Sequence, residues 1–375
     1  MSNLHDATPE ASVDTICHKL QLVFCRNLHE YPFAAKLSEG GSAEGIALRW
    51  ASDLIHQFGF EKVNELSVQT DLLIAPCAHA LPQKRPIDAF LLRRRLEWQG
   101  RSYFVWCELM QQDHFRFSLC LHSVEDLPIL QKLQQLLLQL ENCFHFAYDD
   151  QFGYLTANPD LAGAGFSIHC RAHLPGLTAH DYLEGLCNFA HAQGMTCVND
   201  LERGLPPGNL FQFTNTFALT QTPEAITASA VAFLKCVAHQ EMRIRQCMKY
   251  DSPILLYESL NRMRSFCNYA CLITEEEALN LLSDYWLGRS CGIIPPAKGE
   301  PYAFGHCFDN VRDDVCETEL HLTDCPTDAL QALPARFRDA WHERAFRLDI
   351  LRALWLRPLG QLVFAGDFMK WIDLK

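Results

Sequence analysis

Apolar side chains recur at helical spacing in several long segments of the chain, and they form short strand-like runs in others. In residues 42–60 the large apolar side chains recur every four residues, which is the pattern of an amphipathic helix. These side chains are Ile46, Trp50, Leu54 and Phe58. The same periodicity predicts further helices over residues 127–144, 178–193 and 222–249.

Short aromatic and apolar runs that are bounded by turn residues predict strands. The clearest pair covers residues 103–109 and 114–121, and a polar turn that contains Gln112 separates the two. Further strands are predicted over residues 153–156, 166–174, 195–198 and 209–213. Because strands and helices do not alternate regularly, we expect an α+β fold with a mainly antiparallel sheet flanked by helices, rather than a doubly wound sheet.

The pattern changes near residue 250, after which it predicts helices only. Thr274 and Glu277 have the spacing of a capping box at a helix start. A Pro-rich irregular segment over 292–334 precedes a last strong helix over 335–357. The domains that we expect are a flexible N-terminus at 1–16, an α+β domain at 17–250 and an all-helical C-terminal domain at 251–375.

Charge and composition narrow the function classes. The 375 residues include 32 Lys+Arg and 45 Asp+Glu, and the net charge of −13 opposes binding to nucleic acid or to an anionic membrane. The first residues are polar without an apolar core, so no signal peptide is expected. The 17 cysteines form no CxxC pair and no HExxH motif occurs, which argues against a metal site. We expect reduced thiols and a cytoplasmic protein.

Five runs, taken in order, carry a more specific signal. They are Arg26-Asn27-Leu28, Gly153-Tyr154-Leu155-Thr156, His173-Leu174-Pro175-Gly176-Leu177, Gly208-Asn209-Leu210-Phe211 and Leu272-Ile273-Thr274-Glu275. Their order and spacing resemble those of the ATP:guanido phosphotransferase (phosphagen kinase) superfamily, and specifically of its bacterial protein-arginine kinase branch. The resemblance covers about residues 17–294.

This resemblance implies both a fold and a reaction. The implied fold is an antiparallel sheet flanked by helices, followed by a helical domain that dimerises and binds phosphoarginine in the bacterial branch. The implied reaction transfers the γ-phosphate of Mg-ATP to a guanidinium nitrogen. Such a site needs cations around the triphosphate and carboxylates that hold and deprotonate the guanidinium. The family supplies arginines, two glutamates and commonly a cysteine for these roles.

Few of these catalytic positions keep the family's residue. Arg116 and Glu202 match a phosphate-binding arginine and a glutamate, whereas Gln112 stands at the place of the catalytic glutamate. The loop position that the family often fills with cysteine holds Asn158. Four further arginine positions hold Gln21, Val23, Ser167 and Cys197. Because each pre-organised transition-state donor is worth about 10²–10³ in rate, little of the family's catalysis should remain.

The retained side chains have alternative interpretations. Arg116 could hold a phosphate, or it could pair with a nearby acid. Glu202 could meet a guanidinium, or it could be a solvated loop acid. His169 and Arg171 share a strand face with Ser167, so they could replace lost cations or form an ordinary strand-face pair.

A partial match also occurs in the helical half. Asp349 and Arg352 match part of the branch's phosphoarginine motif, and Arg347 lies one place before a missing arginine. Asp349 and Arg352 would share one face of a helix. They form either a remnant of a phosphate site or a surface ion pair.

The favoured interpretation is a catalytically degenerate relative, a pseudo-enzyme, of protein-arginine kinase that acts by binding or regulation in arginine phosphorylation or protein quality control. For this interpretation the sequence assigns no certain cofactor. One alternative is an active protein-arginine kinase that uses Mg-ATP, and another is a phosphoarginine-binding module. The expected partners are proteins: an active arginine kinase, its activator or a protease complex, in a homo- or heterodimer.

Overall fold

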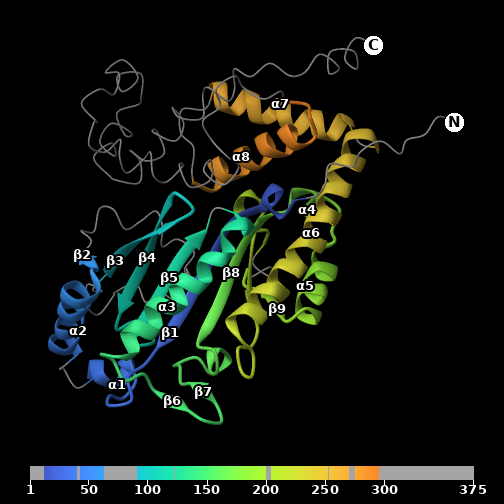
Figure 1. The fold of residues 1–375 in the computed structure, drawn as a ribbon. Helices are drawn as coiled ribbons and strands as arrows, with labels where there is room; N and C mark the ends of the chain where they lie inside the picture. The colour runs from blue at the N-terminus through green and yellow to red at the C-terminus, as the bar shows by residue number, and fades with distance from the viewer. Residues whose placement is uncertain are drawn as a thin grey trace, which may run out of the picture.

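An antiparallel sheet forms the centre of the protein (Figure 1). The structure is a computed structural model that describes residues 12–39, 43–62, 91–121, 123–199, 204–251, 253–269 and 275–294. The eight strands of this central sheet have the order β2-β3-β4-β5-β1-β8-β10-β9, and every neighbouring pair is antiparallel. The expected α+β fold with an antiparallel sheet is therefore confirmed.

The strands combine predicted segments with four that the pattern did not single out. Periodicity did not predict β1, β2, β3 or β6, whereas it predicted β4, β5, β7, β8, β9 and β10. The strands are β1 (Cys17–Arg26), β2 (Glu61–Lys62), β3 (Leu91–Trp98), β4 (Arg101–Leu109), β5 (Phe115–Leu121), β8 (Phe166–His173), β9 (Met195–Cys197) and β10 (Leu210–Asn215). A separate ribbon pairs β6 (Tyr148–Asp149) with β7 (Gly153–Tyr154), so the predicted strand over 153–156 is shorter than expected.

The helices follow the predicted order with two changes, and the first is that the short helix α1 was not predicted. The segment predicted as a single helix over 178–193 is divided into a short α4 and a later α5, because the backbone turns at Asp181, whose φ is 58°. The helices are α1 (Ala34–Glu39), α2 (Ala43–Phe58), α3 (Leu130–Glu141), α4 (Pro175–Ala179), α5 (Leu183–Ala192), α6 (Pro223–Asp251), α7 (Pro253–Tyr269) and α8 (Glu275–Ser290).

The helices cover one face of the sheet and bury its apolar side chains. Leu22 and Phe24 of β1, Phe117 of β5 and Ile168 of β8 point to this face, together with leucines of α3 and Phe233 of α6. Figure 1 shows α3 and α6 lying across the strands. Since side chains alternate along a strand, the residues between these apolar ones point to the opposite face.

The described part of the chain beyond α6 is helical. α7 follows α6 directly, and α8 packs on α7 and on the turn Pro207–Asn209, which precedes β10. Residues 295–375, with the predicted helix over 335–357, lie outside the described residues, and the domain boundary near 250 stays a prediction. Within the described ranges, every helix is too short or too polar to cross a membrane.

Candidate functional site

The sheet face that points away from the helices carries polar side chains from its central strands, and we call it the polar face. Its members are Lys19, Gln21 and Val23 on β1, Arg116 and Ser118 on β5, Ser167, His169 and Arg171 on β8, and Gln212 on β10. In the strand register Gln21 lies opposite His169, and Val23 lies opposite both Ser167 and Ser118. The fold therefore brings Gln21, Val23, Ser167 and Arg116, all predicted to be at phosphate positions, onto one face.

The centre of the polar face is buried and uncharged. Gln21, Ser118, Ser167 and His169 are all buried. Ser167 Oγ lies 3.0 Å from His169 Nε2. Burial, helped by the nearby Arg116 cation, lowers the pKa of His169 to about 3. At neutral pH His169 is uncharged, so it does not replace a lost arginine.

Several polar atoms on this face have no hydrogen-bond partner among the described residues. They are both side-chain amide atoms of Gln21, Ser118 Oγ, His169 Nδ1, Arg116 Nη2 and Gln212 Nε2. A buried polar atom left without a partner costs about 1–3 kcal/mol, so these groups are suited to hydrogen-bond a polar molecule. Most of them are neutral, which favours hydrogen bonding over the binding of several negative charges.

Arg116 pairs with Glu108, which was not among the predicted site residues. Arg116 Nη1 donates to Glu108 Oε1 at 2.7 Å, and the two side chains are only 14% and 16% exposed. The carboxylate balances the guanidinium charge in a largely buried pair. Of the two interpretations of Arg116, the geometry gives the pairing with an acid.

The pairing of Arg116 with Glu108 could have been found in the sequence. The predicted strands 103–109 and 114–121 flank a turn centred on Gln112, and Glu108 and Arg116 are each four residues from that centre. An antiparallel hairpin with a symmetric turn places such residues opposite each other, as the register shows. The sequence thus contains the information that pairs Glu108 with Arg116, but using it requires the correct centre of the turn, which sets the register of the two strands.

Two cations of the central strands, Lys19 and Arg171, lie far from Arg116. Lys19 and Arg171 are opposite each other in the register, whereas Arg116 lies opposite Cys25, six residues further along β1. At about 3.3 Å per residue, roughly 20 Å of strand separates the two ends. The neutral centre of the face lies between them.

Gln112 lies in the β4–β5 turn, which is anchored by its neighbour Asp113. The Gln112 side chain is exposed, whereas Asp113 is buried. Asp113 Oδ1 accepts hydrogen bonds from Asn27 Nδ2 at 2.5 Å and from the backbone N–H of Ala157 at 2.6 Å. Asn27 Oδ1 in turn accepts from the backbone N–H of His114 at 2.9 Å.

His114 continues this network on the other side of the turn. Its Nδ1 accepts from the backbone N–H of Leu28 at 2.9 Å, so Nε2 is the donor to the carbonyl oxygen of Pro32 at 2.8 Å. Burial lowers the pKa of His114, which keeps it neutral. The run Arg26-Asn27-Leu28 is thus part of a frame that fixes the turn. This frame fixes the turn that carries Gln112, the residue that the resemblance assigns to the place of a catalytic glutamate, and the Gln112 amide cannot ionise.

The remaining predicted residues do not join the polar face. Asn158 is exposed, and its side chain accepts from the backbone N–H of Asp160, which shapes a turn. Cys197 lies opposite Phe213 in the register, on the side of the apolar core, and burial raises its pKa to about 12. A thiol with such a pKa is a poor nucleophile.

Four predicted site residues lie outside the described residues. They are Glu202, Arg347, Asp349 and Arg352. Among the described residues, no cluster of His, Cys, Asp and Glu is suited to hold a metal ion.

Comparisons with known proteins bear on the family of the chain. Residues 98–244 match the family model described as ATP:guanido phosphotransferase, C-terminal catalytic domain. The protein-arginine kinase of Syntrophomonas wolfei subsp. wolfei is 31% identical over 203 residues, which are 54% of this chain and 56% of that protein. The protein-arginine kinase of Pelotomaculum thermopropionicum is 26% identical over 281 residues, 72% of this chain and 77% of that protein. The chain thus spans about half the length of the first of these relatives.

Solved structures give weaker matches. The duplicated taurocyamine kinase from Schistosoma mansoni has a TM-score of 0.47 and 13% identity, over 84% of this chain and 48% of that chain. A lombricine kinase has a TM-score of 0.44 and 14% identity, over 66% of this chain and 74% of that chain. From the family match, residues 98–244 belong to the ATP:guanido phosphotransferase superfamily, and the curated relatives that the chain matches are bacterial protein-arginine kinases.

Proposed function

We propose that this chain is a degenerate member of the protein-arginine kinase branch that acts by binding or regulation rather than by phosphoryl transfer. The observation that carries the proposal is the ion pair between Arg116 and Glu108, whose side chains are both largely shielded from solvent. Arg116 is the one phosphate-binding arginine of the family pattern that the sequence keeps, and a carboxylate already balances its charge. A triphosphate that approached Arg116 would also meet the negative charge of Glu108.

The neutral centre of the polar face supports the same proposal. Phosphoryl transfer depends on cations that stabilise the charge of the transferring group. Gln21, Val23 and Ser167 offer no cation, and His169 is uncharged at neutral pH. These described residues do not fit the triphosphate of Mg-ATP. Gln112 can accept a hydrogen bond from a guanidinium, but it cannot take its proton.

The retained frame explains why the fold would persist without the reaction. The hydrogen bonds of Asn27, Asp113 and His114 join β1, the β4–β5 turn and the segment around Ala157. They stabilise the protein whether or not a substrate binds. On this proposal the protein works in the cytoplasm with protein partners in arginine phosphorylation or protein quality control, as a homo- or heterodimer.

The second candidate is an active protein-arginine kinase. It is favoured by the names of the curated relatives and by Lys19 and Arg171, which add cations at one end of the polar face. Such an enzyme would use Mg-ATP and phosphorylate protein arginine. A third candidate, a phosphoarginine-binding module, depends on Arg347, Asp349 and Arg352.

Calorimetric titration with Mg-ATP and a kinase assay on an arginine-rich protein distinguish these candidates. The wild type should give no binding heat and no acid-labile phosphoarginine above background. Glu108→Gln removes the carboxylate that balances Arg116, so it should increase nucleotide affinity relative to the wild type. Glu258→Gln, which breaks the exposed pair with Arg262 on α7, is the matched control and should change nothing. Phosphorylation by the wild type that is lost in Arg116→Ala would reject the proposal.

A further inference from the structure

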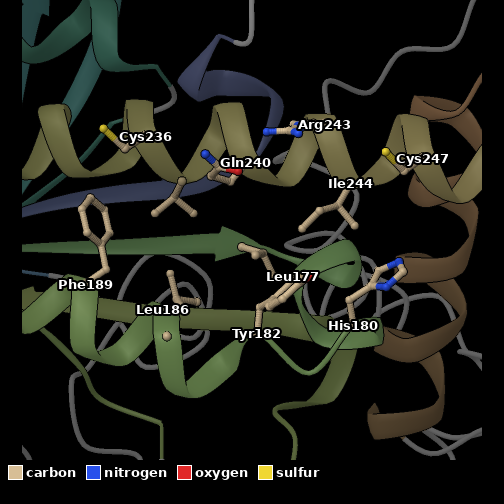
Figure 2. Close-up of a pocket in the computed structure, with 12 residues that line it drawn as sticks. Leu177, His180, Tyr182, Leu186, Phe189, Cys236, Gln240, Arg243, Ile244 and Cys247 are labelled. Carbon is tan, nitrogen blue, oxygen red and sulfur yellow. The ribbon is translucent and has the colours of Figure 1, made fainter.

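A groove lies between α5 and α6 (Figure 2). It is on the helix-covered side of the sheet, because its lining residues Leu186 and Val237 belong to the apolar core. It has a volume of about 740 Å³ and a mainly apolar lining. Leu186 and Phe189 of α5 form one wall, and Val237 and Ile244 of α6 face them. No residue of the polar face takes part in this groove.

Both walls follow the periodicity of a helix. The lining positions of α6 recur at intervals of three or four residues from Cys236 to Cys247, which corresponds to about 16 Å of helix. The lining positions of α5 recur in the same way. Two parallel helical stripes with a gap between them form the kind of groove into which a third amphipathic helix packs. A length of 16 Å accommodates about three turns of such a helix.

The charged residues of the groove indicate which charge the bound helix would carry. Arg243 and His180 line the groove, and both side chains are exposed. None of the described lining residues is acidic, although the chain as a whole has a net charge of −13. Arg243 forms no ion pair with any described residue. A partner with an Asp or Glu near Arg243 would gain a charge-assisted hydrogen bond.

We propose that this groove binds an amphipathic helix of a partner protein, which inserts apolar side chains between α5 and α6 and places a carboxylate against Arg243. The proposal goes beyond the proposed function, because it stands whether or not the polar face binds a nucleotide. It assigns the groove as the surface through which a protein partner is recognised.

Gly185 of α5 offers a way to fill the groove without disturbing the fold. It lines the groove, its backbone is helical, and a Cβ added there would meet nothing within 4 Å. Gly185→Leu should therefore block the groove, and it should also raise the helix propensity of α5. Gly45 of α2 is equally open and helical but remote from the groove, so Gly45→Leu is the matched control.

The experiment selects binders from a displayed library of amphipathic twelve-residue helical peptides, with the full chain as bait and Gly185→Leu as counter-selection. Enriched peptides should share apolar positions at helical spacing and one acidic residue. Fluorescence anisotropy with the enriched peptides should show at least tenfold weaker binding to Gly185→Leu and unchanged binding to Gly45→Leu. Arg243→Glu should weaken binding about tenfold, and a peptide with Lys in place of the acid should restore it.

Three outcomes would overturn the proposal. The first is a library without enriched helices, and the second is a set of peptides that bind Gly185→Leu as well as the wild type. The third is a change in oligomeric state in Gly185→Leu, measured by light scattering, which would assign the groove to a second copy of the chain. Circular dichroism and thermal melting of each variant show whether it is folded, so a loss of binding can be distinguished from unfolding of the variant. None of these measurements depends on whether the chain binds Mg-ATP. A failure of the proposed function can therefore be distinguished from a failure of the groove proposal.

Discussion

A buried ion pair on α6 provides the most quantitative prediction. Glu241 and Arg245 are 0% and 2% exposed, and Arg245 Nε donates to Glu241 Oε1 at 2.7 Å. The carboxylate also accepts from the backbone N–H groups of Gly176 and Leu177, each at 2.8 Å. These two N–H groups belong to the first turn of α4, so Glu241 joins α6 to the start of α4.

Arg245 extends the connection to the helical part of the chain. Its Nη2 donates to the carbonyl oxygen of His173 at 2.9 Å, and His173 Nε2 lies 2.8 Å from Ser283 Oγ on α8. Asn209 Nδ2 donates to the same Ser283 oxygen at 2.8 Å. The network therefore joins the end of β8, the start of β10 and α8.

The change to test is Glu241→Gln. The amide keeps the shape of the side chain but leaves the Arg245 charge buried without a counter-ion. Removing one partner of a buried pair costs about 3–5 kcal/mol, whereas an exposed pair contributes about 0–1 kcal/mol. Glu258 and Arg262 of α7 form an ion pair with the same i,i+4 spacing, but their side chains are 56% and 80% exposed. Glu258→Gln is therefore the matched control.

Urea denaturation followed by circular dichroism measures the free energy of unfolding of each variant. Glu241→Gln should lose roughly 3–4 kcal/mol, and Glu258→Gln less than about 0.5 kcal/mol. The double variant Glu241→Gln/Arg245→Met should be less destabilised than the sum of its single changes, because it buries no unpaired charge. Equal costs for the buried and the exposed pair, or simple additivity of the two single changes, would refute the reasoning.

Three further predictions concern α8, glycine geometry and thiols. Burial raises the pKa of Asp284 to about 6. The Asp284 carboxyl therefore keeps its proton to higher pH in the folded protein than in the unfolded chain. The folded protein loses stability as the pH rises from about 4 to 6. In urea denaturation, Asp284→Asn should match the wild type at pH 4 and be roughly 1–3 kcal/mol more stable at pH 7; the opposite sign would contradict this. Gly208 and Gly292 have nearly the same backbone angle, with φ of 68° and 69°. A Cβ added at Gly208 would lie 2.9 Å from a backbone carbonyl oxygen of α8, whereas a Cβ at Gly292 would approach no backbone atom of the described residues. Gly208→Ala should therefore lower the melting temperature clearly more than Gly292→Ala. Titration of the thiols in the native protein should show a fast phase from exposed cysteines. Changing the exposed described cysteines to serine should reduce this phase by about three equivalents, and an unchanged fast phase would contradict the burial pattern. These cysteines are Cys143, Cys236 and Cys247.

The sequence by itself predicted the elements that have a strong local pattern. The helices at α2, α3 and α6 and the β4–β5 hairpin follow from the spacing of side chains within one segment, and local spacing needs no tertiary contact. The motif positions also indicated the family, because residues such as those of Arg26-Asn27-Leu28 build its frame. The resemblance likewise assigned two uncharged residues, Gln21 and Ser167, to arginine positions of the family.

Only the tertiary structure decided what these residues do together. Gln21, Ser118 and His169 are distant in the chain, and they meet because β1 pairs with both β5 and β8. The register of β9 with β10 turns Cys197 toward the apolar core, although its position in the motif had suggested a place in the phosphate site. The partner of Arg116 likewise depends on the strand opposite it. Strand pairing sets which side chains share a face, and a shift of one residue would reverse every one of these assignments.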